Sequence, residues 1–341
     1  MTHKKHKRLL VIRLSAMGDV ALSVPVIESF LEQFPDIEMA MLTRKAFNPF
    51  FKDIHNLKII NPSFDKNHKG LFGIYKLSKS IKKEFNPDFV IDIHDVLRTK
   101  LLRFFFKTFG VKSTKIDKGR KEKRELVRYE NKVLKKLKHT AQRYADCFRN
   151  AGFVFNFPDP ENSILNEIDN SLPKLKNIGI APFAKHLQKQ YPFDLMKQVI
   201  AGLVQNGRQV YIFGGGSNEK EIAERLEIEF PGVISLIGKY SLEEEMEKVS
   251  QMDIMITGDS ANMHIAALMN TKIVSVWGAT HPFAGFTPYA PGHKITYIQN
   301  NNLNCRPCSV FGNKPCFKGT LECLHSISPE MIIDACISDS I

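Results

Sequence analysis

The chain has 341 residues, of which 43% are hydrophobic and 25% charged, a composition typical of folded proteins and about twice the length of one domain. No apolar run approaches the roughly 20 residues that cross a bilayer, and the apolar stretch after the basic first residues is too short for a secretory signal. We therefore expect a cytoplasmic protein of two domains. The net charge of +12 allows nucleic acid, anionic lipid or a phosphorylated substrate as partner.

Strand-like and helix-like segments alternate in the first half of the chain. A predicted strand at residues 9–13 is followed by a helix at 20–33, and further strands are predicted at 37–42, 57–60 and 89–93. This alternation indicates βαβ units and a parallel sheet.

A proline-flanked polar stretch at residues 158–174 predicts a linker, after which the pattern restarts. The predicted strands of the second half are residues 178–181, 209–213, 233–236, 254–257 and 273–276. The fold class is therefore α/β, with two Rossmann-like domains at residues 1–170 and 171–341 that face each other across a cleft, and with a last helix free to pack back on the first domain. Ligands of such sheets bind beyond the carboxyl ends of the strands.

The loop after the first strand carries a carboxylate where chemistry is expected. It follows Arg13, turns at Gly18 and opens into a helix at Asp19. Asp19 can either cap the helix or act as a general base. The glycine spacing matches neither a dinucleotide fingerprint nor a P-loop, which disfavours a nicotinamide-dependent oxidoreductase.

Two neighbouring loops in the second half predict a phosphate-and-sugar pocket. A helix begins at Asp259 or Ser260, where its free main-chain N–H groups suit a diphosphate. His264 on its first turn is either a ligand contact or a packed core histidine. The loop at residues 277–282, with Gly278 as its turn residue, emerges at the same edge of the sheet.

Two further loops complete the predicted pocket. Lys185 and Lys189 follow the strand at 178–181 and could neutralise a leaving diphosphate. Three glycines at 214–216 allow close approach of a ligand, and Glu219 could accept hydrogen bonds from ribose hydroxyls.

Residues 98–143 carry 17 Lys or Arg and four acidic residues, an excess that accounts for the whole net charge. Within them, residues 101–109 interleave bulky apolar side chains with cations, as in a segment that rests on an anionic interface. A core helix with a solvated basic face explains the pattern equally well. A nucleic-acid-binding module is a rival, but the segment has no recognisable readout motif.

Four of the six cysteines form a C-x2-C-x7-C-x6-C pattern at residues 305–323. The first pair suits a zinc knuckle, but the second half lacks a matching pair. Reduced cysteines that pack a C-terminal loop are the favoured alternative.

Together these motifs resemble the ADP-heptose:lipopolysaccharide heptosyltransferases of glycosyltransferase family 9, over nearly the whole chain. The matching segments, in the family's order, are IRLSAMGDV at 12–20, KQYP at 189–192, DSANMHIAA at 259–267 and GATHP at 278–282. The resemblance implies a GT-B fold and inverting, metal-independent transfer of a heptose from an ADP-sugar to a lipopolysaccharide core or lipid A acceptor. It also implies work at the cytoplasmic surface of the inner membrane, with no cofactor and no nucleic-acid partner.

In this interpretation Asp19 is the catalytic base and Lys189 the phosphate-binding lysine. The donor is expected to contact Gly18, Lys185, Gly214, Glu219, Asp259, Ser260, Ala261, Asn262, Met263, His264, Gly278 and Thr280. Acceptor or membrane contacts are expected from Arg98, Arg103, Lys121, Lys123 and Arg124, and no metal ligands are predicted.

The chain departs from the family's usual residues at Ala184 and Lys185, Tyr191, Ala261 and Ala279. These departures bear on which sugar and which nucleotide are used. The alternative function is that of another GT-B nucleotide-sugar enzyme, with a different donor or with epimerase activity.

Overall fold

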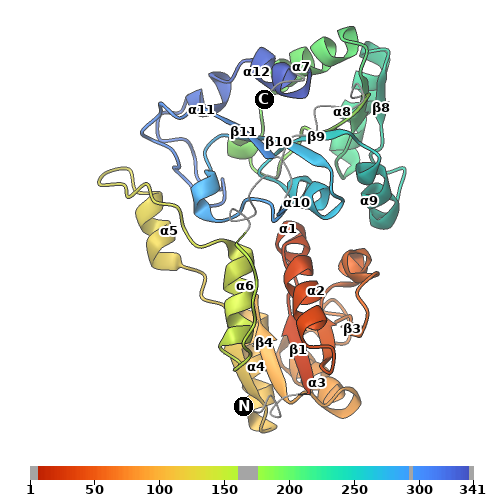
Figure 1. Cartoon of the computed structure of the whole chain (residues 1–341), viewed down its shortest axis with the longest axis vertical. Coiled ribbons are helices and arrows are strands. Elements are labelled where there is room, and N and C mark those ends of the chain that lie inside the picture. The colour runs from red at the N-terminus through yellow and green to blue at the C-terminus, as the bar shows by residue number, and fades with distance from the viewer. Residues whose placement is uncertain (1–6, 160–175, 292–294, 338–341) are drawn as a thin grey trace. The chain divides into compact units, whose positions relative to one another are not determined.

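The structure, a computed structural model, describes residues 7–159, 176–291 and 295–337 (Figure 1). The chain divides into two compact units, Met1–Lys118 with Thr140–Pro158 and Gly119–His139 with Asp159–Ile341. Residues Gly119–His139 thus group with the second unit, whereas the prediction assigned them to the first. The predicted boundary at residue 170 and most of the predicted linker lie outside the described residues. In the described ranges, no helix is long and apolar enough to cross a membrane.

The first unit is built on a parallel sheet with the strand order β3-β2-β1-β4-β5. Its elements in chain order are β1 (Arg8–Ile12), α1 (Met17–Ala21), α2 (Val24–Gln33), β2 (Glu38–Leu42), η1 (Lys45–Phe51), β3 (Leu57–Ile60), α3 (Gly70–Glu84), β4 (Phe89–Asp92), α4 (Leu97–Thr108), β5 (Lys112–Lys115) and α6 (Thr140–Arg149). Helix α3 packs with α4, and α2 with α6 (Figure 1). Right-handed crossovers put these pairs on opposite faces of the sheet.

The helix predicted at residues 20–33 is two helices in the structure. Helix α1 ends at Ala21, and the Ser23 hydroxyl donates a hydrogen bond to the carbonyl of Val20 at 2.6 Å. Pro25 lies in the first turn of α2 and has no N–H to bond to the preceding turn. The break keeps α1 short and leaves its first turn beside the carboxyl end of β1.

The second unit is built on a parallel sheet with the order β11-β10-β9-β6-β7-β8. Its elements are α5 (Arg120–Leu126), β6 (Asn177–Ala181), η2 (Leu187–Lys189), α7 (Phe193–Gln205), β7 (Gln209–Ile212), α8 (Ser217–Glu229), β8 (Val233–Ser235), α9 (Leu242–Ser250), β9 (Ile254–Gly258), α10 (Ala261–Leu268), β10 (Lys272–Trp277), η3 (Pro282–Ala284), β11 (Ile295–Gln299), α11 (Glu322–His325) and α12 (Pro329–Ile337). The last helix, α12, packs on α7 of this unit (Figure 1).

The segment Gly119–His139 is held to the second unit by apolar and polar contacts. Leu126 and Leu137 are buried in one cluster with Ala284. The N–H of Leu137 donates to the carbonyl of Phe283 at 2.9 Å. The local basic excess of the sequence is therefore shared between the two units.

Both sheets have a point at which the strand order reverses. It lies between β1 and β4 in the first unit and between β6 and β9 in the second. In open α/β sheets ligands bind at the carboxyl ends of the strands at such a point. The prediction of two parallel-sheet α/β domains is confirmed.

Candidate active site

Asp19 lies in the first turn of α1, next to the carboxyl end of β1. Its carboxylate pairs with the guanidinium of Arg13 at 2.5 Å and accepts a long hydrogen bond of 3.4 Å from the hydroxyl of Tyr144. Arg13 itself is buried and donates to the carbonyl of Ile93 at 2.8 Å. The N-cap position of α1 belongs to Ala16, so Asp19 does not cap this helix. The Asp19 side chain keeps 29% of its surface exposed, which leaves it open to a ligand.

His94 is a second polar group at the same reversal point, and it was not predicted from the sequence. It follows β4, is buried, and has Nε2 at 3.5 Å from the hydroxyl of Ser15. Burial, and then the positive charges of Arg13 and Lys118, lower the pKa of His94 to about 3. A neutral imidazole therefore lies near Asp19 at physiological pH. His94 could have been predicted by the rule that pointed to Asp19, because it follows the carboxyl end of β4 as Asp19 follows that of β1.

Lys189 and Asp259 meet at the reversal point of the second sheet. The ammonium of Lys189, in the loop after β6, lies 2.9 Å from the carboxylate of Asp259, which follows β9. Two glycines make this approach possible. A Cβ on Gly258 would lie 2.8 Å from the carbonyl oxygen of Lys189, and one on Gly312 would lie 2.4 Å from its Cγ.

The start of α10 provides main-chain donors that have no partner within the helix, beside this ion pair. Ser260 is the N-cap residue, and its hydroxyl lies 2.9 Å from that of Thr257 rather than on the helix backbone. The first N–H groups of a helix have no partner within it. Ala261 and Asn262 are partly exposed, whereas Met263 and His264 are buried. The exposed start of α10 can therefore bind an anion, while His264 lies in the packed interior.

The loop after β10 is held in shape by a buried arginine that the sequence analysis missed. Arg306 donates hydrogen bonds to the carbonyls of Gly278, Trp277 and Thr280 at 2.6, 3.0 and 3.1 Å. Gly278 and Thr280 are themselves buried, so they shape the loop rather than offer side chains at its surface. No spacing rule identifies Arg306, because its partners are carbonyls about 30 positions earlier in the chain.

In the glycine loop after β7, the side chain of Glu219 bonds to the main chain of the loop. The Glu219 carboxylate accepts a hydrogen bond from the N–H of Gly215 at 2.8 Å. A Cβ on Gly214 would lie 2.7 Å from that carboxylate, which explains the glycine there. Lys185, in the loop after β6, is exposed.

The residues predicted to contact an acceptor or a membrane are divided between the two units. Arg98 is exposed, with its guanidinium 4.8 Å from the ring centre of Phe64. Arg103 pairs with Asp92 at 2.8 Å and Asp95 at 2.9 Å, which offset its charge. Lys121 and Arg124 are exposed, but on α5 in the second unit.

Lys123 was predicted to contact an acceptor or a membrane. It is buried, and its ammonium lies 4.2 Å from the ring centre of Phe286, where it contributes a cation–π contact. It faces the interior because it lies one turn before Leu126 on the same face of α5. Lys123 thus does not present its charge to a membrane.

The four cysteines of the C-terminal pattern line one small cavity together with Arg306. Cys308 and Cys323 are buried, and Cys305 and Cys316 partly exposed. Among the residues that the structure describes, no three His, Cys, Asp or Glu side chains are arranged to hold a metal ion. Lys132 donates to the carbonyls of Asn304, Cys305 and Pro307, and so ties this loop to the segment Gly119–His139.

Comparisons with known proteins give matches in both sequence and structure. The sequence model of glycosyltransferase family 9 (heptosyltransferase) matches residues 74–315. A lipooligosaccharide heptosyltransferase 2 of Campylobacter jejuni is 23% identical over 331 residues, with 93% of each chain covered. A glycosyltransferase of family 9 from Veillonella parvula superposes with a TM-score of 0.71 at 19% identity, covering 96% of each chain. The Escherichia coli heptosyltransferase WaaC with ADP has a TM-score of 0.63 at 18% identity, covering 90% of this chain and 96% of its own.

Proposed function

The chain belongs to glycosyltransferase family 9, and we propose that it transfers a heptose from an ADP-sugar to a lipopolysaccharide core or lipid A acceptor, with inversion of the anomeric carbon. The observation that carries the proposal is the position of the family's motifs. Asp19 lies at the reversal point of one parallel sheet and the Lys189–Asp259 pair at that of the other. These are the points at which open α/β sheets bind ligands.

In the proposed reaction Asp19 removes the proton from the acceptor hydroxyl as the oxygen attacks the anomeric carbon. The bond to the diphosphate breaks in the same step, so the configuration inverts once. Arg13 and Tyr144 hold the Asp19 carboxylate in place for this role. A positioned general base typically contributes a factor of about 10² to 10⁴ in rate.

The departing diphosphate needs positive charge and hydrogen-bond donors. Lys189 supplies an ammonium that Asp259 orients, and the start of α10 supplies main-chain N–H groups. A fixed cation and oriented amides can perform the charge stabilisation for which other transferases use a divalent metal. We therefore propose that the reaction needs neither metal nor cofactor.

Membership of the family and the names of its relatives support the sugar and the acceptor. The similar protein of Campylobacter jejuni is a lipooligosaccharide heptosyltransferase, and the solved structure of WaaC holds ADP. We propose that the acceptor lies at the cytoplasmic surface of the inner membrane, where an anionic glycolipid would be met by a protein of net charge +12.

The test is a transfer assay on the purified chain with ADP-heptose and a delipidated lipopolysaccharide core acceptor, with and without EDTA. We expect ADP release that depends on the acceptor, an NMR spectrum with the inverted anomeric configuration, and an unchanged rate in EDTA. A different sugar preferred over heptose would refute the donor assignment. Conversion of the donor without acceptor would support the epimerase alternative instead.

A further inference from the structure

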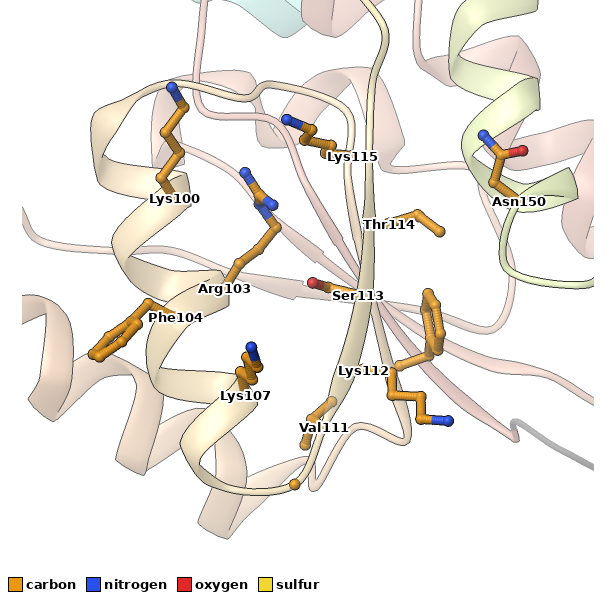
Figure 2. Close-up of a pocket in the computed structure, with 12 residues that line it drawn as sticks. Lys100, Arg103, Phe104, Lys107, Val111, Lys112, Ser113, Thr114, Lys115 and Asn150 are labelled. Atoms are coloured by element: carbon orange, nitrogen blue, oxygen red, sulfur yellow. The ribbon is translucent and has the colours of Figure 1, made fainter.

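An open hollow of about 930 Å³ lies on the first unit, between helix α4 and strand β5 (Figure 2). The proposed reaction does not use it. Its lining includes five cations, from two elements that follow one another in the chain, and no carboxylate. The cations are Lys100, Arg103, Lys107, Lys112 and Lys115.

Four of these cations carry charge that nothing nearby offsets. Arg103 pairs with Asp92 and Asp95, but the four lysines are exposed and make no ion pair within the described parts of the chain. A cluster of like charges without counter-charges is unfavourable to the folded protein and favourable to an anionic ligand. The hollow is therefore suited to a ligand that carries several negative charges.

The lysines are arranged along the hollow rather than at one point. Lys100 and Lys107 are seven residues apart on α4, which is about two turns and about 10 Å. Lys112 and Lys115 lie at the two ends of β5, about 10 Å apart. Lys100 and Lys115 lie toward one end of the hollow, and Lys107 and Lys112 toward the other, with Lys112 on the far side of the strand (Figure 2). Lys112 and Lys115 are three residues apart in a strand and so project from opposite faces of the sheet. Lys100, Lys107 and Lys115 therefore lie on the side of β5 that faces α4, and Lys112 lies across the strand (Figure 2).

Strand β5 adds main-chain donors to these charges. It is the last strand of its sheet and pairs only with β4 among the described strands. The N–H of Ile116 points toward β4, where it donates to the carbonyl of Asp92 at 2.9 Å. Successive residues of a strand point their N–H groups to opposite sides. The N–H groups of Ser113 and Lys115 therefore point away from β4, and the free edge of a sheet is a known kind of anion site.

Apolar side chains accompany the charges on the same helix. Phe104, which is 59% exposed, lines the hollow, and Leu97, which is 74% exposed, lies two turns earlier on that face of α4. Phe104 projects to the outer side of the helix, away from β5 (Figure 2). Exposed aromatic and aliphatic groups beside lysines are typical of helices that lie in a membrane interface.

From these observations we propose that the groove between α4 and β5 docks the protein on an anionic membrane, with lipid phosphates bound by Lys100, Lys107 and Lys115 in the groove and by Lys112 across the edge strand, and with Phe104 inserted among the lipids. The docking proposal rests on the proposed function only in that docking would bring the enzyme to a membrane-bound acceptor. Lysines on an edge strand can also serve simply to prevent strand pairing between molecules. That alternative requires no lipid and predicts aggregation when the lysines are removed.

The experiment compares three variants with the wild type in co-sedimentation with vesicles of phosphatidylcholine, with and without phosphatidylglycerol. The groove variant replaces Lys100, Lys107, Lys112 and Lys115 by Gln. The control variant has the same net charge as the groove variant, because it replaces four other exposed lysines of the same unit by Gln. These lysines do not line the hollow and are Lys45, Lys58, Lys66 and Lys83. The third variant is Phe104→Ser.

We expect wild type to bind anionic vesicles in preference to neutral ones, and less at high salt. A lysine near an anionic surface is worth about fivefold in binding, so the groove variant should lose more than about tenfold and the control far less. Phe104→Ser should weaken binding at all salt concentrations. Equal losses in the groove and control variants, or equal binding of wild type to neutral vesicles, would overturn the proposal.

Two further readouts separate this proposal from its rivals. If the groove variant aggregates while its monomer binds vesicles as wild type does, the lysines only protect the sheet edge and the docking proposal is wrong. Transfer to a soluble, delipidated acceptor should stay unchanged in the groove variant. Failure of that assay in the wild type would refute the proposed function while leaving the vesicle result intact.

Discussion

Replacement of Lys189 by Met tests the assignment of the leaving-group cation. The variant leaves the Asp259 carboxylate, which is 9% exposed, without its partner at 2.9 Å. Removing one member of a buried ion pair costs about 3 to 5 kcal/mol, and because Lys189 is 17% exposed we expect the lower end. For a unit of about 200 residues a loss of about 3 kcal/mol lowers Tm by roughly 6 to 12 °C.

The stability loss must be separated from the loss of function. The double variant Lys189→Met/Asp259→Asn removes both charges and should recover most of the Tm, because no buried charge is left unpaired. Its turnover should nevertheless remain about 10²- to 10³-fold below wild type, as expected when a donor to a developing negative charge is lost. The stabilisation of the protein by ADP, measured as the rise in Tm, should also shrink in both variants.

The assays are thermal unfolding with and without ADP, and ADP release at saturating acceptor. If the double variant has wild-type Tm, wild-type ADP response and turnover within about twofold, the ion pair only maintains the fold. Lys185, which is exposed in the same loop, would then be the next candidate.

Two further predictions concern titration. Burial lowers the pKa of His94 to about 3 and of His139 and His281 to about 4, so each takes up a proton on unfolding below pH 6.5. The free energy of unfolding should therefore fall as the pH drops from about 6.5 toward 4, by about 1.4 kcal/mol per pH unit for each histidine. Burial raises the pKa of Glu245 to about 7, so this group stabilises the folded protein as the pH falls and offsets the contribution of one of the three histidines. Urea titrations that show no loss of stability over this range would contradict it. Burial alone would raise the pKa of Cys316, but N–H groups of residues 318–321 outweigh it and lower the pKa, whereas burial raises that of Cys323 to about 11. Iodoacetamide at pH 8 should therefore alkylate Cys316 before Cys323, as followed by mass spectrometry. Faster alkylation of Cys323 than of Cys316 would contradict this prediction.

The strands with strongly apolar sequences could be predicted from the sequence to within a residue or two at each end. The strand predicted at residues 57–60 is β3, and that at 178–181 lies within β6. Strand β6 is central in its sheet and has buried side chains on both faces, which gives a continuous apolar run, whereas β3 is an edge strand whose apolar side chains are only partly buried. Strand β5 has the sequence KSTK, because a strand at the edge of a sheet need not be apolar, and it was missed.

The site could be predicted only where a side chain lies in the loop or first helical turn after a strand. Asp19 and the Lys189–Asp259 pair lie at the two reversal points, as the loop positions indicated. Arg306 could not be predicted, because its role depends on carbonyls that only the fold brings to it. The burial of Lys123 could not be predicted for a related reason, because a run of charges does not reveal which of its members packs against an aromatic ring.

Turnover of Asp19→Asn with ADP-heptose and acceptor at saturation shows whether Asp19 is the base of an inverting transfer. We expect turnover to fall about 10²- to 10⁴-fold, with ADP affinity unchanged because Asp19 and the Lys189–Asp259 pair belong to different units. Loss of the pairing with Arg13 should lower stability measurably, so Tm is recorded beside the rate to show that the variant is folded in the assay. Turnover above about half of the wild-type value, in a variant that is folded and binds ADP, would contradict the account and leave Asp19 as a partner of Arg13 alone.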